Sequence, residues 1–276
     1  MEMLTYIYSK WKNNNDIELN RDELCFLYET EEDILGFGYD DDPRIYEIKK
    51  DRNIKKDLSI LLDIPENQIS LTKEEATKPN IIYHYGDLDF SDLTDGNSLR
   101  LPEIVKGYID LSNMRSANGS KLPRIVYGTL DMNGLLSAQN VEFPNEVDYL
   151  YLQSITSAED LKLPNAIRRY LDLSGLKSAK GLILSDGISS VDLSGLTSAK
   201  FLELPNEMDF VILGGLTSGD GLRLPNNIKD ALDLSNLKSI DGMIIPDELN
   251  CELYCPLAND DINVLKQMCM KNSKSK

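Results

Sequence analysis

Histidine is almost absent from this sequence of 276 residues, which contains His84 and no other. Hydrolase-type chemistry needs a nucleophile, a base and an acid within hydrogen-bond reach of one another, and histidine most often serves as the base. No nucleophile motif accompanies His84 in the sequence. We therefore expect a protein that is not an enzyme and that uses no cofactor.

Cysteine is scarce as well, and the four residues are Cys25, Cys251, Cys255 and Cys269. A structural zinc site takes about four cysteine or histidine ligands, and the single histidine lies far from this group in the chain. The sequence therefore predicts no metal site. Buried, reduced cysteines are the better interpretation, and they are typical of a cytoplasmic protein.

Long apolar runs are missing too, because no segment approaches the roughly 18 consecutive apolar residues of a transmembrane helix. Residues 1–16 also lack the basic start and apolar core of a secretory signal peptide. We expect a cytoplasmic protein without a membrane partner, and export without a cleavable signal peptide stays open as an alternative.

Basic residues are outnumbered, since 29 Lys and Arg stand against 46 Asp and Glu and give a net charge of −17. A protein that binds nucleic-acid phosphates needs a basic patch, and none is visible. We therefore expect no direct contact with nucleic acid. The acidic surplus favours solubility, or attraction to a basic protein partner.

The sequence does contain a repeat, with a period of 20 or 21 residues, that is clearest from Tyr170 to Leu204. Each unit opens with an anchor residue in a Leu-Asp-Leu-Ser pattern and continues to a Leu-x-Leu-Pro segment, with a further apolar residue three positions after the proline. The anchors are Leu88, Ile109, Leu130, Leu150, Leu171, Val191, Val211, Leu232 and, more weakly, Cys251. A fixed period in this range indicates a solenoid.

Both apolar segments of the unit alternate apolar and polar residues, which is the period of a β-strand. The proline ends the second segment, and the clusters of Ser, Gly, Ala and Asn between the segments are typical of turns. The repeat therefore predicts coils with two short strands and two turns each, stacked around a shared core. With strands about 4.8 Å apart, nine coils would span roughly 40 Å.

The unit Leu-Pro-x-x-Ile-x-x-x-Leu-Asp-Leu-Ser-Gly-Leu-x-Ser-Ala-x-x-Leu-x-Leu-Pro resembles the short leucine-rich repeats of bacterial effectors. The resemblance covers residues 81–257 and implies a solenoid that holds partner proteins. One departure is Ser-Gly or Ser-Asn where common leucine-rich repeats place Asn, so a squarer β-solenoid with strands on two sides is an alternative. Some such effectors carry a ubiquitin-ligase domain after the repeats, and the short segment that follows here does not imply one.

Residues 1–80 lack the repeat and carry apolar residues at helical spacing. Helices are expected over Met3–Trp11, after a capping Asn20 with Glu23 three residues later, after Asp40–Asp42 before Pro43, over Lys55–Leu62, and from Thr72. We interpret the run of aspartates as a helix start rather than a metal site. The expected fold class is thus a mostly β solenoid, a leucine-rich-repeat-like rod of about nine coils. A helical N-terminal unit (1–80) would cap one end, and a short helix with a disordered tail (258–276) would follow the solenoid (81–257).

Equivalent positions of stacked coils form columns. The residue after each anchor gives Asp89, Asp110, Asp131, Tyr151, Asp172, Asp192, Ile212, Asp233 and Glu252. Like charges on paired strands destabilise a sheet, so this acidic column needs a reason. The carboxylates could accept hydrogen bonds from turn amides and serine hydroxyls, form an acidic face for a basic partner, or hold cations.

The residue before each anchor adds aromatic side chains to the same face. Aromatic residues among acids resemble the core and rim of a protein interface, while cross-strand packing that merely stabilises the sheet is the alternative. The candidate partner-binding residues are Tyr108, Asp110, Asp131, Tyr149, Tyr151, Tyr170, Asp172, Asp192, Phe210 and Asp233.

The leading hypothesis is a non-enzymatic module that binds a protein or peptide on this face, with a basic partner favoured by charge. One alternative is an acidic inhibitor that mimics DNA, although one carboxylate per coil of about 5 Å is sparser than the charge of duplex DNA, about one per 1.7 Å. Another is a secreted bacterial effector that binds host proteins. The sequence does not name the partner or the oligomeric state.

Overall fold

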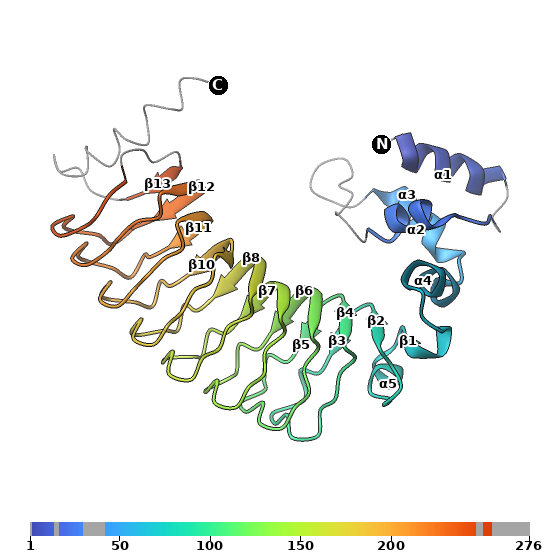
Figure 1. Ribbon diagram of the computed structural model, residues 1–276, viewed down its shortest axis with the longest axis horizontal. Coiled ribbons are helices and arrows are strands. Elements are labelled where there is room, and N and C mark those ends of the chain that lie inside the picture. The colour runs from blue at the N-terminus through green and yellow to red at the C-terminus, as the bar shows by residue number, and fades with distance from the viewer. Residues whose placement is uncertain (1, 14–16, 30–41, 247–250, 256–276) are drawn as a thin grey trace. The chain divides into compact units, whose positions relative to one another are not determined.

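The computed structural model describes residues 2–13, 17–29, 42–246 and 251–255. The chain divides into two compact units (Figure 1). The helical unit comprises Met1–Leu71 with Asn80–Ile82, and the solenoid unit comprises Thr72–Pro79 with Tyr83–Lys276. Among the described residues, no helix is long and apolar enough to cross a membrane. The expected C-terminal helix lies outside the described residues.

In the residues that the structure describes, the helical unit contains four short helices and a short strand. These are α1 (Glu2–Asn13), α2 (Arg21–Leu27), α3 (Pro43–Lys50) and α4 (Ile54–Leu62), followed by the 3-10 turn η1 (Glu66–Gln68) and β1 (Ile69–Ser70). Their apolar faces meet in a core that includes Leu4, Ile7, Leu24, Ile48 and Leu58, all inaccessible to solvent. The expected helices of this unit are therefore confirmed.

Side chains predicted to start helices do so. Asn20 accepts a hydrogen bond of 2.9 Å from the backbone amide of Glu23, whose carboxylate accepts one of 2.8 Å from the amide of Asn20. This reciprocal pair satisfies two amides that helix geometry leaves without partners. Asp42 caps α3, and hydrogen bonding to the Arg44 side chain lowers the pKa of its carboxyl. Asp40 and Asp41 lie outside the described residues.

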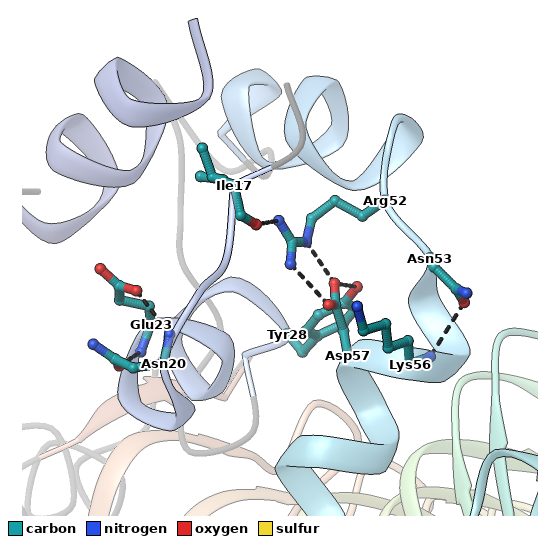
Figure 2. A network of polar contacts seen from close by, with 8 residues as sticks. All are labelled: Ile17, Asn20, Glu23, Tyr28, Arg52, Asn53, Lys56 and Asp57. Atoms are coloured by element: carbon teal, nitrogen blue, oxygen red, sulfur yellow. Dashed lines mark hydrogen bonds and ion pairs between the residues drawn. The ribbon is translucent and has the colours of Figure 1, made fainter. Parts of the chain in front are cut away.

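A buried ion pair fastens the helices of this unit together (Figure 2). Arg52 holds both carboxylate oxygens of Asp57, with 2.8 Å between Nη2 and Oδ1, and its Nη1 donates to the carbonyl of Ile17 at 2.9 Å. The Tyr28 hydroxyl donates to Asp57 Oδ2 at 2.8 Å. Every charge in this network has several partners, which a buried ion pair requires if it is not to destabilise the fold.

The solenoid unit contains parallel strands that lie side by side along the inner side of a curved row of coils (Figure 1). Their bounds are β2 (Tyr83–Tyr85), β3 (Leu88–Asp89), β4 (Ile104–Lys106), β5 (Ile109–Asp110), β6 (Ile125–Asp131), β7 (Glu146–Tyr151), β8 (Ala166–Asp172), β9 (Gly187–Ile188), β10 (Ser190–Asp192), β11 (Glu207–Ile212), β12 (Asn227–Asp233) and β13 (Glu252–Tyr254). The strands enclose about eight turns. The predicted mostly β solenoid is therefore confirmed.

The first coil is covered within the same unit by the short helix α5 (Lys73–Ala76). Ala76 is buried in the apolar core that runs through the coils. The ammonium group of Lys73 lies 4.6 Å from the centre of the Phe90 ring and 3.3 Å from a carboxylate oxygen of Asp92. Thr72, expected to open this helix, accepts a hydrogen bond from the amide of Glu75.

In the described residues the strands of every coil belong to one sheet, whereas a second row of strands was predicted at the Leu-x-Leu-Pro segments. In the described residues the Leu-x-Leu-Pro segments make only isolated bridges, Arg100 with Lys121 and Arg223 with Ile244. Their leucines are nevertheless buried, as Leu161 and Leu202 illustrate. These segments lie on the outer side of the curved row, where neighbouring coils are further apart than at the sheet (Figure 1). Their leucines are therefore buried although the backbones do not form a ladder of hydrogen bonds. A solenoid with sheets on two sides is not formed.

The strand extends instead to the apolar residue that follows each proline, and a bulge absorbs the variation in repeat length. In the register of β6 and β7, Val126 pairs with Val147 and Thr129 pairs with Tyr149. β6 therefore carries one more residue than β7 between these pairs. Units of 20 and 21 residues stack because a β-bulge accommodates the extra residue at the sheet.

The Ser-Gly turns exist because neighbouring coils approach closely there. A Cβ atom on Gly175 would lie 1.8 Å from the carbonyl oxygen of Gln153, and one on Gly215 would lie 2.1 Å from that of Ser194. Where asparagine replaces glycine, its amide reaches the preceding coil instead, as Asn113 does with a bond of 2.8 Å to the carbonyl of Ser91.

The last anchor was assigned wrongly from the sequence. In the register of β12 and β13, Leu232 pairs with Leu253 rather than with Cys251. Glu252 therefore stands beside Ala231, and Tyr254 takes the position after the anchor, beside Asp233. The error arose because Cys251 is apolar and buried, so that burial alone does not distinguish it from an anchor.

Candidate functional site

The exposed side of the parallel sheet carries the candidate residues in two columns. The register aligns Thr129, Tyr149 and Tyr170 before the anchors, and Asp110, Asp131 and Tyr151 after them. Further along, Ser190 pairs with Phe210, and Asp172, Asp192, Ile212 and Asp233 follow in order. We call these two columns, from Asp87 to Tyr254, the sheet face.

The anchors between the columns of the sheet face are inaccessible to solvent, as for Leu130, Leu150 and Leu171, and they hold the face against the core. Tyr108 exposes 36% of its surface, whereas Asp172 exposes 5%. The remaining candidates are half-buried. Their bodies are thus held by neighbours while one edge of each side chain reaches solvent.

The aspartates after the anchors each close a turn. Asp110 Oδ1 accepts hydrogen bonds from the amide and the hydroxyl of Ser112, at 2.9 and 2.6 Å. In the other aspartates of this column, Oδ1 likewise accepts a hydrogen bond of 2.7 to 3.0 Å from the backbone amide two residues further along the chain. These are Asp89, Asp131, Asp172, Asp192 and Asp233. The bonds from Ser91 lower the pKa of Asp89. The expectation that turn amides and hydroxyls satisfy this column is confirmed.

The second oxygen of three aspartates accepts a hydrogen bond from a side chain of the preceding coil. The Tyr108 hydroxyl donates to Asp131 Oδ2 at 2.9 Å, and the Tyr170 hydroxyl donates to Asp192 Oδ2 at 3.3 Å. Burial, as the larger cause, and the neighbouring carboxylates raise the pKa of both phenol groups. Both hydroxyls therefore stay protonated and can donate. In Asp172, Oδ2 accepts from the amide group of Gln153 at 2.7 Å.

Two aspartates near the start of the face differ. The outer oxygens of Asp89 and Asp110 accept no hydrogen bond from the residues that the structure describes. The same holds for Asp233, whose turn contacts involve Oδ1. These carboxylates keep one acceptor directed away from their own turn.

Aromatic side chains fill the middle of the face. The rings of Tyr151 and Tyr170 lie 6.0 Å apart and are tilted by 54°, an arrangement favoured for aromatic pairs. Burial, together with nearby Tyr149 and Asp172, raises the pKa of Tyr151. The contact between Tyr151 and Tyr170 is consistent with packing that stabilises the sheet. The Tyr149 hydroxyl, in contrast, makes no hydrogen bond within the described residues that would explain its position on the face.

A further cluster beside the face was missed from the sequence. Arg168 bonds Asp148 at 3.0 Å and also pairs with Glu146, and its guanidinium lies 5.1 Å from the centre of the Tyr127 ring. Tyr127 exposes 37% of its surface. These residues occupy the strand extension between the proline and the anchor. Because the predicted strand began only at the anchor, nothing placed them on the same sheet.

Positive charge is missing from the sheet face itself. Among the described residues, neither column contains a lysine or an arginine, and the column of turn residues from Ser91 to Ser235 contains none. Bases beside the face are paired with acids: Arg168 with two of them, Lys229 with Asp209 at 2.7 Å, and Lys73, which lies near Asp89, with Asp92 at 3.3 Å. The two columns therefore carry acidic, aromatic and other uncharged side chains and no basic one in the described residues.

No catalytic arrangement is evident in the described residues. His84 is inaccessible to solvent in β2, and burial lowers the pKa of its imidazole, so it stays neutral and out of reach of a substrate. Two open hollows lie on the Leu-x-Leu-Pro side and share Glu142, Phe143 and Asn145. Neither is lined by histidine or cysteine. Across all the residues that the structure describes, no group of three or more His, Cys, Asp or Glu side chains is placed so that it could hold a metal ion.

Comparisons with protein-family models, with curated proteins and with solved structures found no match to this chain.

Proposed function

We propose that this chain is a non-enzymatic protein-binding module that holds a protein or peptide partner on the sheet face. The observation that carries the proposal is the set of partly exposed aromatic side chains among carboxylates, with Tyr108, Tyr149, Tyr151 and Tyr170 on successive or next-but-one coils. Aromatic residues with a polar end are enriched at interfaces because they bury a large area and still hydrogen-bond.

The fold supports this role by fixing the side chains before a partner arrives. Backbone ladders, the turns closed by aspartates and the bonds from Tyr108 and Tyr170 hold the face in one arrangement. A binding surface that is already ordered loses less conformational entropy on association, which leaves more of the contact free energy as affinity. The proposal applies equally to a protein that stays in the cytoplasm and to one that is exported.

The test removes aromatic area from the face without removing a hydrogen bond. We expect a Tyr149→Ala/Phe210→Ala variant to lose a partner that the wild type captures from a lysate of the producing cells, because interface aromatics contribute about 2 kcal/mol or more when they are anchors. The matched control is Ile183→Ala/Phe201→Ala, which removes apolar side chains exposed by 78% and 57% on the other side of the coils. Circular dichroism and thermal unfolding would establish that both variants fold.

Loss of the partner in the first variant and retention in the control support the proposal. Equal capture by the wild type and both variants would remove the sheet face from consideration. A DNA-mimicking role receives less support, because the acidic column is interrupted at Tyr151 and Ile212 and its inner oxygens are used in turns.

A further inference from the structure

We infer that the occupant of the sheet face is an extended segment carrying two basic residues about six positions apart with an apolar residue between them. This inference rests on the proposed function and adds the chemistry of the partner. It follows from the charges on the face, from the carboxylate oxygens left open, and from the spacing of the coils.

Charge complementarity selects a basic partner. The two columns and the turn column beside them carry acids and no base in the described residues. A lysine or arginine on the partner would meet a carboxylate and an aromatic ring together at Asp110. Asp110 ends β5, and Tyr108 directly precedes that strand. Aromatic faces attract cations by about 0.5–2 kcal/mol, depending on how far the pair is desolvated.

Two places on either side of the aromatic centre can take a cation, whereas the open oxygen of Asp233 lies two coils further along, beyond Ile212. Asp110 offers an outer oxygen with no partner in the described residues, with Asp89 and Asp131 on the adjacent coils. Asp192 offers an oxygen whose bond from Tyr170 is long, at 3.3 Å, so an incoming cation can share it. Asp172 is excluded because it is buried and both of its oxygens are engaged.

The distance between these places sets the spacing on the partner. Asp110 and Asp192 are four coils apart, through Asp131, Tyr151 and Asp172. At about 4.8 Å per coil this is roughly 19 Å, which an extended chain covers in about six residues at about 3.3 Å each. An even separation puts both basic residues on one side of the chain, since side chains alternate.

The centre of the face calls for an apolar residue. Tyr149, Tyr151 and Tyr170 lie between the two acidic places, and their rings bring no charge. The partner residues two and four positions after the first cation point to the same side as the two cations and would therefore lie over these rings. Burial of an apolar residue there would favour binding, whereas an acidic residue there would lose hydration and meet the like charges of Asp131 and Asp172.

The experiment is selection of random 12-residue peptides displayed on phage against the folded wild-type protein. We expect the recovered peptides to contain pairs of Lys or Arg about six positions apart with an apolar residue between. Their binding should weaken as salt is raised from low to high ionic strength. It should also be lost with Tyr149→Ala/Phe210→Ala, which ties the peptides to the sheet face.

The decisive variant is Asp110→Asn/Asp192→Asn. Asparagine keeps an oxygen that can accept from the amides of Ser112 and Ser194, so the turns are retained while two charges are removed. We expect about fivefold to tenfold weaker binding of a synthetic recovered peptide, from two partly exposed ion pairs with aromatic support. The control Glu142→Gln/Glu203→Gln removes the same charge from exposed positions of the Leu-x-Leu-Pro segments and should bind as the wild type does.

The outcomes separate this inference from the proposed function. Neutral or acidic peptides whose binding needs Tyr149 and Phe210 would overturn the basic partner and leave the proposed function standing. Peptides that bind independently of both sheet-face variants would overturn both. Recovery of no binding peptide would exclude a short extended segment as the occupant, and equal binding by Asp110→Asn/Asp192→Asn and the wild type would exclude the two cation positions.

Discussion

The hydroxyl of Tyr108 donates a hydrogen bond of 2.9 Å to the outer carboxylate oxygen of Asp131 on the next coil. The two residues are 23 positions apart in the chain, and each belongs to a different column of the sheet face. The side chains proposed to bind a partner thus also join coils to one another. Experiments on the face must therefore separate stability from binding.

We expect Tyr108→Phe to lower the free energy of unfolding by about 0.5–1.5 kcal/mol, the usual net value of one hydrogen bond. The ring stays, so the apolar area of the face is unchanged. Urea denaturation followed by circular dichroism would measure the shift. Tyr149→Phe is the control, because no hydrogen bond of its hydroxyl is found in the described residues. Equal stabilities of the two variants would contradict the contribution assigned to the Tyr108–Asp131 bond.

Two adjacent glycines should respond very differently to alanine. A Cβ atom on Gly215 would lie 2.1 Å from the carbonyl oxygen of Ser194 and 2.5 Å from that of Leu196, both rigid backbone atoms. We expect Gly215→Ala to destabilise the solenoid by about 2–4 kcal/mol, because the coils must move apart.

The neighbouring substitution Gly214→Ala places its Cβ atom 3.4 Å from the side chain of Asp233, a distance at which that side chain can adjust. It should change stability by less than about 1 kcal/mol. Thermal unfolding of the two variants side by side would test the close approach of coils. A similar loss in both would mean that glycine is needed for another reason.

Stability should decrease on mild acidification because of His84. Burial lowers the pKa of its imidazole in the folded chain, so the unfolded chain binds the proton more readily. The stabilisation that neutral His84 contributes is fully present above a pH of about 6.5, which is the pKa of histidine in an unfolded chain. It is lost as the pH falls below that value, by up to about 1.4 kcal/mol per pH unit until the folded pKa is reached.

The measurement is the free energy of unfolding between pH 7 and pH 5, a window above the usual titration of carboxylates. His84→Gln is the comparison, since glutamine does not titrate. We expect the slope of stability against pH in this window to be smaller in the variant. An unchanged slope would show that His84 is not its source.

The buried ion pair of the helical unit should matter far more than an exposed one. Arg52→Met leaves the Asp57 carboxylate, exposed by 6%, without its guanidinium, and such a loss costs about 3–5 kcal/mol. Lys12→Met, which removes an exposed pair with Glu47 at 3.7 Å, should cost less than about 1 kcal/mol. Fluorescence of Trp11, the only tryptophan, reports unfolding of this unit. Comparable midpoints for the two variants would contradict the role of the Arg52–Asp57 pair.

The sequence by itself determined the solenoid, because a period of 20 or 21 residues with buried anchors such as Leu130 and Leu171 can be satisfied only by stacking coils. It also determined local helix starts, since Asn20 and Glu23 recognise each other three residues apart. Both kinds of information are short-range or strictly periodic. They can be read without knowing which coil lies next to which.

The tertiary structure alone decided where strands form, how the last coil aligns and which carboxylates stay open. Alternation of leucines predicts burial but not a hydrogen-bond partner, so the Leu-x-Leu-Pro segments bury Leu161 and Leu202 without pairing as strands. Leu253 rather than Cys251 pairs with Leu232 because the backbone ladder, and not side-chain polarity, fixes the register. The contrast between Asp110 and Asp131 depends on contacts more than twenty residues apart, which exist only once the coils are stacked.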